Sequence, residues 1–171
     1  MIDRTDFENI LTSHYFYDNG LIYFIREGKD TCVNEEFLTF DAYIKGLFAE
    51  KDKRTTIKVQ GIETYNKQIL KHCYKLSEVW NKPVDCHAYF GYGGRGSFDM
   101  HSDPCEVCIY ICEGTKRITT GGENHVLKEG EHLYIKKQQP HQAFNEEDCL
   151  SLSFGSYDFS KDKIMNIGFK L

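Results

Sequence analysis

Glycine turns at short, regular intervals limit what the second half of this chain can fold into. From Val84 onward, short segments rich in aromatic and β-branched side chains alternate with such turns. The turns fall at Gly91–Gly96, Gly114, Gly121-Gly122, Gly130 and Gly155. Strands broken about every 8–12 residues by turns are typical of an antiparallel sandwich or barrel. We therefore expect a mainly β fold, a double-stranded β-helix (jelly roll) preceded by N-terminal helices.

The first half of the chain mixes helix and strand signals. Apolar residues at helical spacing predict a helix over Asp6–His14, with Thr5 as its N-cap. The turn signal Asn19-Gly20 precedes a predicted buried strand. The remaining predicted elements are that strand, Leu21–Ile25, a helix over Glu35–Glu50, a strand over Thr55–Gln60 and a helix over Ile62–Trp80.

The 171 residues show no linker or internal repeat, which predicts a single domain. Within it, we expect residues 1–82 to form a helix-rich lead-in packed on the barrel. Residues 83–157 are expected to form the jelly-roll core that carries the functional site.

Composition is that of a globular protein and argues against several functions. Hydrophobic residues make up 40% of the chain, and the formal net charge of -5 argues against a broad nucleic-acid-binding surface. The charged start, Met1–Asp6, has no signal peptide's apolar stretch, and no apolar run reaches the about 18 residues of a membrane span. We therefore expect a soluble, cytoplasmic protein whose seven cysteines are reduced thiols.

Three side chains of the second half have the chemistry of metal ligands. His101 and Asp103 are two residues apart, so on a strand they would project from the same face. Alone, this H-x-D pattern more often marks an exposed polar strand. His141 changes that balance, because it follows a glycine turn and a strand, and a jelly roll can return it to the same end of the barrel. Two histidines and one carboxylate bind one face of Fe(II) and leave the other face open.

Lys116 is a fourth candidate, just after the turn Glu113-Gly114-Thr115. A lone lysine on a strand is usually a surface residue. In a site that chelates a dicarboxylate through iron, however, the far carboxylate would need a cation. Lys116 is the best-placed candidate for that role.

The sequence around these positions resembles a known family. His101–Ile109 followed by Glu113–Lys116 resembles the JmjC-type oxygenases of the cupin superfamily, which depend on Fe(II) and 2-oxoglutarate. It is most similar to their ribosomal-oxygenase branch, with its H-x-D…E-V-x-I…E-G-x-K pattern. Leu127–Gly130, Leu133–Ile135 and Pro140–Ala143 resemble the branch's L-x-x-G-D-x-L-Y-x-P…H-Q-A segment.

The resemblance implies an Fe(II) site and a cosubstrate site. His101, Asp103 and His141 would ligate Fe(II), where O₂ also reacts, and Lys116 would bind the C5 carboxylate of 2-oxoglutarate. Tyr89 stands on the strand before the site, where the family also has a tyrosine.

Three further residues are candidates for the cosubstrate pocket. His87 replaces an asparagine that the family commonly carries, so hydrogen bonding there is expected to differ. Ser153 shares one strand face with Ser151, and both serines either line the pocket or are ordinary strand polarity.

The implied activity is hydroxylation of a C–H bond in a protein side chain or a small substrate, coupled to 2-oxoglutarate decarboxylation. Members of the ribosomal branch continue into a dimerisation region and a winged-helix module, which the sequence up to Leu171 does not show. We therefore carry over neither the dimer nor recognition of a protein substrate. The oligomeric state and a lid role for Gly91–Gly96 stay open.

Other functions also stay open. A cupin-like dioxygenase that does not use 2-oxoglutarate would leave Lys116 incidental, and a binding module could keep the ligands without turnover. Cys105 and Cys108 have zinc-ligand spacing, but residues three apart on a strand face opposite sides. We therefore do not favour a structural zinc site.

Overall fold

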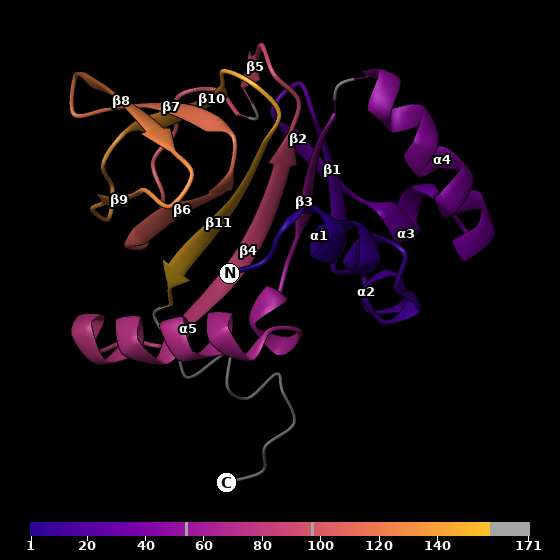
Figure 1. The fold of residues 1–171 in the computed structure, drawn as a ribbon, viewed down its shortest axis with the longest axis horizontal. Helices are drawn as coiled ribbons and strands as arrows, with labels where there is room; N and C mark the ends of the chain where they lie inside the picture. Colours follow the sequence, from indigo (N-terminus) through magenta and orange to yellow (C-terminus); the bar gives the residue numbers. More distant parts are fainter. Residues whose placement is uncertain (54, 97, 158–171) are drawn as a thin grey trace, which may run out of the picture.

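The computed structural model describes residues 1–53, 55–96 and 98–157 (Figure 1). The helices are α1 Arg4–Leu11, α2 His14–Asp18, α3 Val33–Glu36, α4 Phe40–Lys53 and α5 Lys67–Trp80, with a short 3-10 helix, η1, over Ile62–Thr64. The strands are β1 Ile22–Arg26, β2 Lys29–Cys32, β3 Thr56–Val59, β4 Val84–Gly91, β5 Arg95–Gly96, β6 Val107–Glu113, β7 Thr115–Thr120, β8 Glu123–Lys128, β9 His132–Ile135, β10 His141–Asn145 and β11 Cys149–Ser156.

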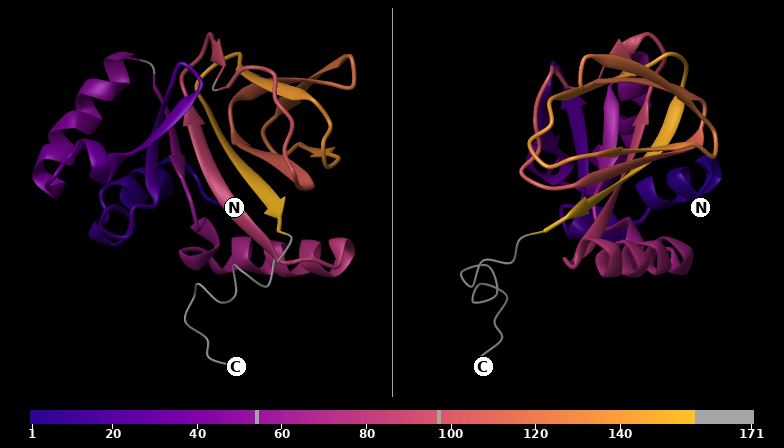
Figure 2. Two further views of the ribbon diagram at one scale, coloured as in Figure 1. Left: turned by 180° about the vertical axis from the view of Figure 1, so that it is seen from behind. Right: turned by 90° about the vertical axis from the view of Figure 1, so that its left-hand side faces the viewer.

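In this described part of the chain, the strands form two antiparallel sheets. The larger sheet has the order β2-β1-β3-β4-β11-β6-β9, and the smaller one has the order β5-β10-β7-β8. Figure 2 shows the two sheets facing each other in the second half of the chain, with α1, α2 and α4 on the other side of the larger sheet. The predicted jelly roll with N-terminal helices is confirmed.

The pleat of the larger sheet separates two kinds of side chain. On β4 and β11 the even-numbered residues face the helices, where Phe90, Leu152 and Phe154 pack with Phe7 and Ile69 in one apolar core. The odd-numbered residues face the smaller sheet. There a second core lies between the sheets, formed by Val107, Ile109, Ile111, Ile118, Leu127, Ile135 and Cys149.

The first helix begins earlier than predicted. Its N-cap is Asp3, whose carboxylate accepts from the Asp6 backbone N–H at 2.8 Å, and the Asp6 side chain accepts from the Asp3 backbone N–H. This reciprocal capping box satisfies two N–H groups that the helix leaves unpaired, so the predicted cap, Thr5, lies inside the helix.

Two predicted helices are each split. Glu35–Glu50 is interrupted after α3 because Phe37 is extended, with its ring against Phe24 and Tyr43 in the core. Ile62–Trp80 is divided into η1 and α5 because the Asn66 side chain accepts from two backbone N–H groups and starts a new helix. No helix in residues 1–53, 55–96 and 98–157 is long and apolar enough to cross a membrane.

The lead-in also contains a strand that the sequence did not predict. Glu27 and Gly28 both have positive φ, 51° and 76°, which makes a tight two-residue turn between β1 and β2. Because β1 pairs with β3 and β3 with β4, the first half extends the larger sheet instead of only covering it.

We predict that Gly114→Ala strongly destabilises the fold. Gly114 has φ 80°, and a Cβ there would lie 2.2 Å from the carbonyl oxygen of Asp148. We expect unfolding free energy to fall by about 3 kcal/mol or more, measured by urea denaturation. Gly130→Ala is the control, because Gly130 has φ 83° and open space around it, and should cost only about 1 kcal/mol. Equal losses in the two variants would contradict the steric explanation.

Candidate metal centre

The structure brings together the three side chains that the sequence singled out. His101 and His141 form an isolated antiparallel bridge, with backbone N–H to C=O distances of 3.0 and 2.8 Å in the two directions. Their ring centroids lie 4.4 Å apart, and His141 Nε2 lies 3.4 Å from Asp103 Oδ2. Ligand-capable atoms of all three residues lie within 4.8 Å of one another. This is a compact set of two imidazoles and one carboxylate.

His101 and Asp103 do not lie on a regular strand as the sequence argument expected. They lie in the loop before β6. Among the described residues of this loop, His101 forms an isolated bridge to His141 of β10. Pro104 has no N–H to continue a ladder. The Asp103 carbonyl instead accepts from the Gln138 N–H at 2.8 Å, which ties the loop to the segment before β10.

Backbone carbonyls fix the tautomer of both histidines. Nδ1 of His101 lies 2.8 Å from the Asp99 carbonyl oxygen, and Nδ1 of His141 lies 3.0 Å from that of Gln139. Because a carbonyl can only accept, each Nδ1 carries a proton, and the neutral form of each ring therefore has its lone pair on Nε2. These residues therefore fit a metal ion. The carbonyls that accept from Nδ1 are partners of the kind that orient metal-binding imidazoles. Sequence reasoning missed Asp99 and Gln139 because they act through their backbone.

Lys116 lies in the same cavity as the three metal-capable residues. The cavity, of about 80 Å³, is lined by His101, Asp103, His141 and Lys116 among others. The Lys116 side chain is buried in β7, and its ammonium donates to the Ser151 hydroxyl. Among the described residues it pairs with this hydroxyl and with no carboxylate. Burial lowers the pKa of Lys116, because the charged form loses its hydration.

The structure places the remaining predicted pocket residues on two sides of the cavity wall. Tyr89, Ser151 and Ser153 line the cavity that holds Lys116. Burial, together with the Asp103 carboxylate, raises the pKa of the Tyr89 phenol, which therefore keeps its proton.

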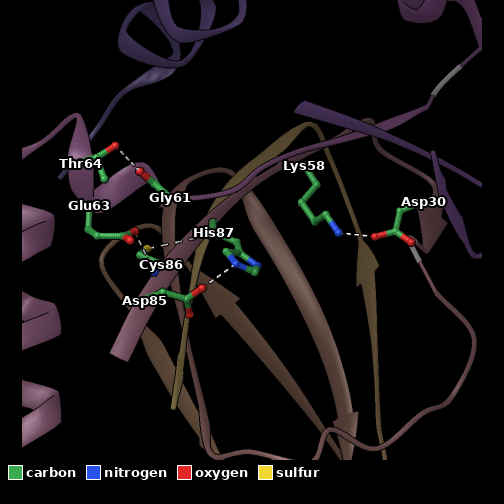
Figure 3. A network of polar contacts seen from close by, with 8 residues as sticks. All are labelled: Asp30, Lys58, Gly61, Glu63, Thr64, Asp85, Cys86 and His87. Carbon is green, nitrogen blue, oxygen red and sulfur yellow. Dashed lines mark hydrogen bonds and ion pairs between the residues drawn. The ribbon is translucent and has the colours of Figure 1, made fainter. Parts of the chain in front are cut away.

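His87 lies outside that small cavity. Its Nε2 is 2.7 Å from Asp85 Oδ2, and both residues line a wider cavity of about 490 Å³ (Figure 3). The two cavities share Tyr89, Asp103, Val107 and Ser153 as a common wall.

The cysteines are not part of the candidate metal centre, although Cys105 lines the wider cavity beside Asp103. The cysteines are free thiols, and none of them belongs to the metal-capable cluster of the described residues. Cys108 packs with Tyr110 against the helix-side core. In the Gly91–Gly96 loop, the Tyr92 ring meets Phe90 edge to face on that same side.

Comparisons with known proteins support the fold. Residues 89–154 match the cupin domain family. The chain is structurally similar to YcfD, a ribosomal oxygenase from Escherichia coli, with a TM-score of 0.66 and 16% identity over 96% of this chain and 46% of that chain. A YcfD structure in complex with cobalt and succinic acid has a TM-score of 0.66 at 15% identity, with the same coverage of 96% and 46%.

A further structure of this Escherichia coli oxygenase has a TM-score of 0.53 and 19% identity over 66% of this chain and 34% of that chain. The present chain thus spans about half the length of the oxygenase, at 46%. The comparison with curated protein sequences gives no significant match. Together these comparisons support a jelly-roll fold of the cupin type.

We predict that the three residues bind one divalent metal ion. Titration with Co(II), followed by its visible absorption, should show one site per chain. His101→Ala, Asp103→Ala and His141→Ala should each weaken binding at least about 100-fold, since loss of an outer partner alone costs about 10- to 100-fold. His132→Ala is the control, because His132 is exposed on β9 and lies outside the cluster. Unchanged Co(II) affinity in the three variants would contradict the assignment.

We also predict that Lys116 destabilises the ligand-free fold. Lys116→Met should raise unfolding free energy by about 1 kcal/mol or more near neutral pH, because it removes a buried charge. The folded-state pKa of Lys116 lies below the ordinary 10.5, so between the two values the unfolded chain binds more protons. Wild-type stability should therefore rise relative to Lys116→Met as pH approaches 10.5. Denaturation midpoints at several pH values test this, and a constant gap would contradict it.

Proposed function

We propose that this chain is an Fe(II)- and 2-oxoglutarate-dependent oxygenase that hydroxylates a C–H bond. One observation carries the proposal. A single cavity is lined by two imidazoles, a carboxylate and a buried lysine. A metal ion and an anion can therefore be held side by side in it.

The donor set favours iron(II) in an open site. Two imidazole nitrogens and one carboxylate oxygen are the facial arrangement of non-haem Fe(II) oxygenases. Nε2 of His101 and of His141 would be the nitrogen donors, because Nδ1 of each is held by a carbonyl. Asp103 would supply the oxygen. Three protein ligands leave the remaining positions for cosubstrate and O₂.

Lys116 supports the choice of a dicarboxylate cosubstrate. Its ammonium would pair with the carboxylate far from the metal, which relieves the cost of a buried charge without a counter-ion. The Ser151 hydroxyl, which accepts from Lys116, has its own proton to donate to that carboxylate. The protonated Tyr89 phenol adds a second donor from β4.

Apolar side chains form part of the same cavity wall. Val107, Ile109 and Ala143 line it beside the polar groups. Low polarity strengthens the Lys116 ion pair and limits access of water. When bound, iron(II) with 2-oxoglutarate and O₂ supplies the oxidant for hydroxylation, with release of succinate and CO₂. The substrate would be a protein side chain or a small molecule that reaches the metal through the wider cavity.

We predict a visible charge-transfer band when Fe(II) and 2-oxoglutarate are added without oxygen. The band reports chelation of iron by the 2-oxo acid. It should be absent in Asp103→Ala and unchanged in His132→Ala. In Lys116→Met it should need at least about 100-fold more 2-oxoglutarate, because a buried charge would then lack its partner.

The other outcomes distinguish the alternatives. Iron binding without the band would contradict the proposal and indicate a metalloprotein that does not use 2-oxoglutarate. The band without succinate formation in air would contradict turnover and indicate a binding module.

A further inference from the structure

A second lysine, Lys58, faces the wider cavity from the middle of β3. In the sheet register, Lys58 pairs with Tyr89, and Tyr89 pairs with Ser151. Paired residues lie on the same face, so this row joins Lys58 to the serine that holds Lys116. With strands about 4.8 Å apart, the backbones of Lys58 and Ser151 are about 10 Å apart. Tyr89 thus stands between an inner and an outer cation.

The outer cation is more deeply buried than its counter-ion. The Lys58 ammonium points to Asp30 of β2, as Figure 3 shows, and lies 4.3 Å from the centre of the Tyr23 ring. The Lys58 side chain is 8% exposed, whereas that of Asp30 is 43% exposed. Asp30 is therefore within reach of water and of other anions, while the ammonium stays in the cavity wall. An anion that replaces Asp30 would keep the buried ammonium paired, so this partner is exchangeable.

The other carboxylates of this region already have partners. Asp85 is engaged by His87 at 2.7 Å, and Glu63 accepts from the Cys86 backbone N–H at 3.0 Å (Figure 3). An anion that enters the cavity would therefore compete for Lys58 with Asp30, and not with Asp85 or Glu63. The cavity also reaches Asp103, a proposed metal ligand, so a molecule held at Lys58 can extend to the metal centre.

We propose that Lys58 binds an anionic group of the substrate, a carboxylate or a phosphate, and that Asp30 occupies this position in the free protein. The inference rests on the proposed function, because it assigns the substrate class of the same site. Lys116 would bind the cosubstrate and Lys58 the substrate, on opposite sides of Tyr89. The reacting carbon would lie between the anionic group and the metal.

Anion titrations of the metal-free, ¹⁵N-labelled chain test this proposal. Sodium phosphate and sodium acetate are added separately at constant ionic strength, with chloride as the balancing anion. We expect saturating shifts at the backbone amides of Lys58, Tyr23 and Tyr89. Asp30→Asn should tighten binding about two- to fivefold, because it removes the competing carboxylate. Lys58→Met should abolish saturation.

The variants keep the test decisive. A purely structural ion pair would make Asp30→Asn no better at binding anions, which would overturn the proposal. Because Asp30→Asn keeps the cation, it remains informative even if Lys58→Met folds poorly. Shifts that vanish in Lys116→Met would place the anion at Lys116 and also overturn it. Stronger binding of phosphate would indicate a phosphorylated substrate, and stronger binding of acetate a carboxylic acid.

No metal or 2-oxoglutarate is present in these titrations. Failure at Lys58 is therefore distinguishable from failure of the charge-transfer experiment.

Discussion

The reciprocal pair of backbone hydrogen bonds between His101 and His141 is the constraint on which the site depends. It joins a loop to the first residue of β10, and strands β6 to β9 lie between the two in the sequence. The bridge sets the two imidazoles side by side, and carbonyls two residues before each histidine orient the rings. The geometry of the two metal-capable imidazoles is thus set by main-chain contacts, which side-chain substitutions elsewhere disturb little.

Two lysines lie beside this arrangement and carry the two proposed binding positions. One row of paired residues across β3, β4 and β11 carries Lys58, Tyr89 and Ser151, and Ser151 receives the Lys116 ammonium from the facing sheet. The lead-in strands therefore contribute to the cavity as well as to the fold. They bring β3 against β4 and so supply the outer wall of the wider cavity.

Local patterns in the sequence predicted the jelly roll, the position of His141 at a strand start and the proximity of the three metal-capable residues. The first two features depend on glycine turns and strand patterns, which are short-range signals. The proximity of the three residues was predicted from alternation on a strand, but His101 and Asp103 lie in a loop that the bridge to His141 holds in place. The split of the Glu35–Glu50 helix depends on Phe37 packing into a distant core, and Lys58 gains its position through pairing of β3 with β4. Such long-range contacts leave no signal in the local sequence, which favours a surface position for a lone lysine.

The alternation along β4 and β11 has a consequence for how such a molecule diversifies. Neighbouring positions on these strands have different roles. Every second side chain packs in the apolar core, and those between them face the cavities. Substitutions at Asp85, His87 or Ser153 can therefore change the lining of the cavities, while Phe90 and Leu152 continue to stabilise the fold. A single-residue insertion within either strand would exchange the two sets and forfeit both properties at once.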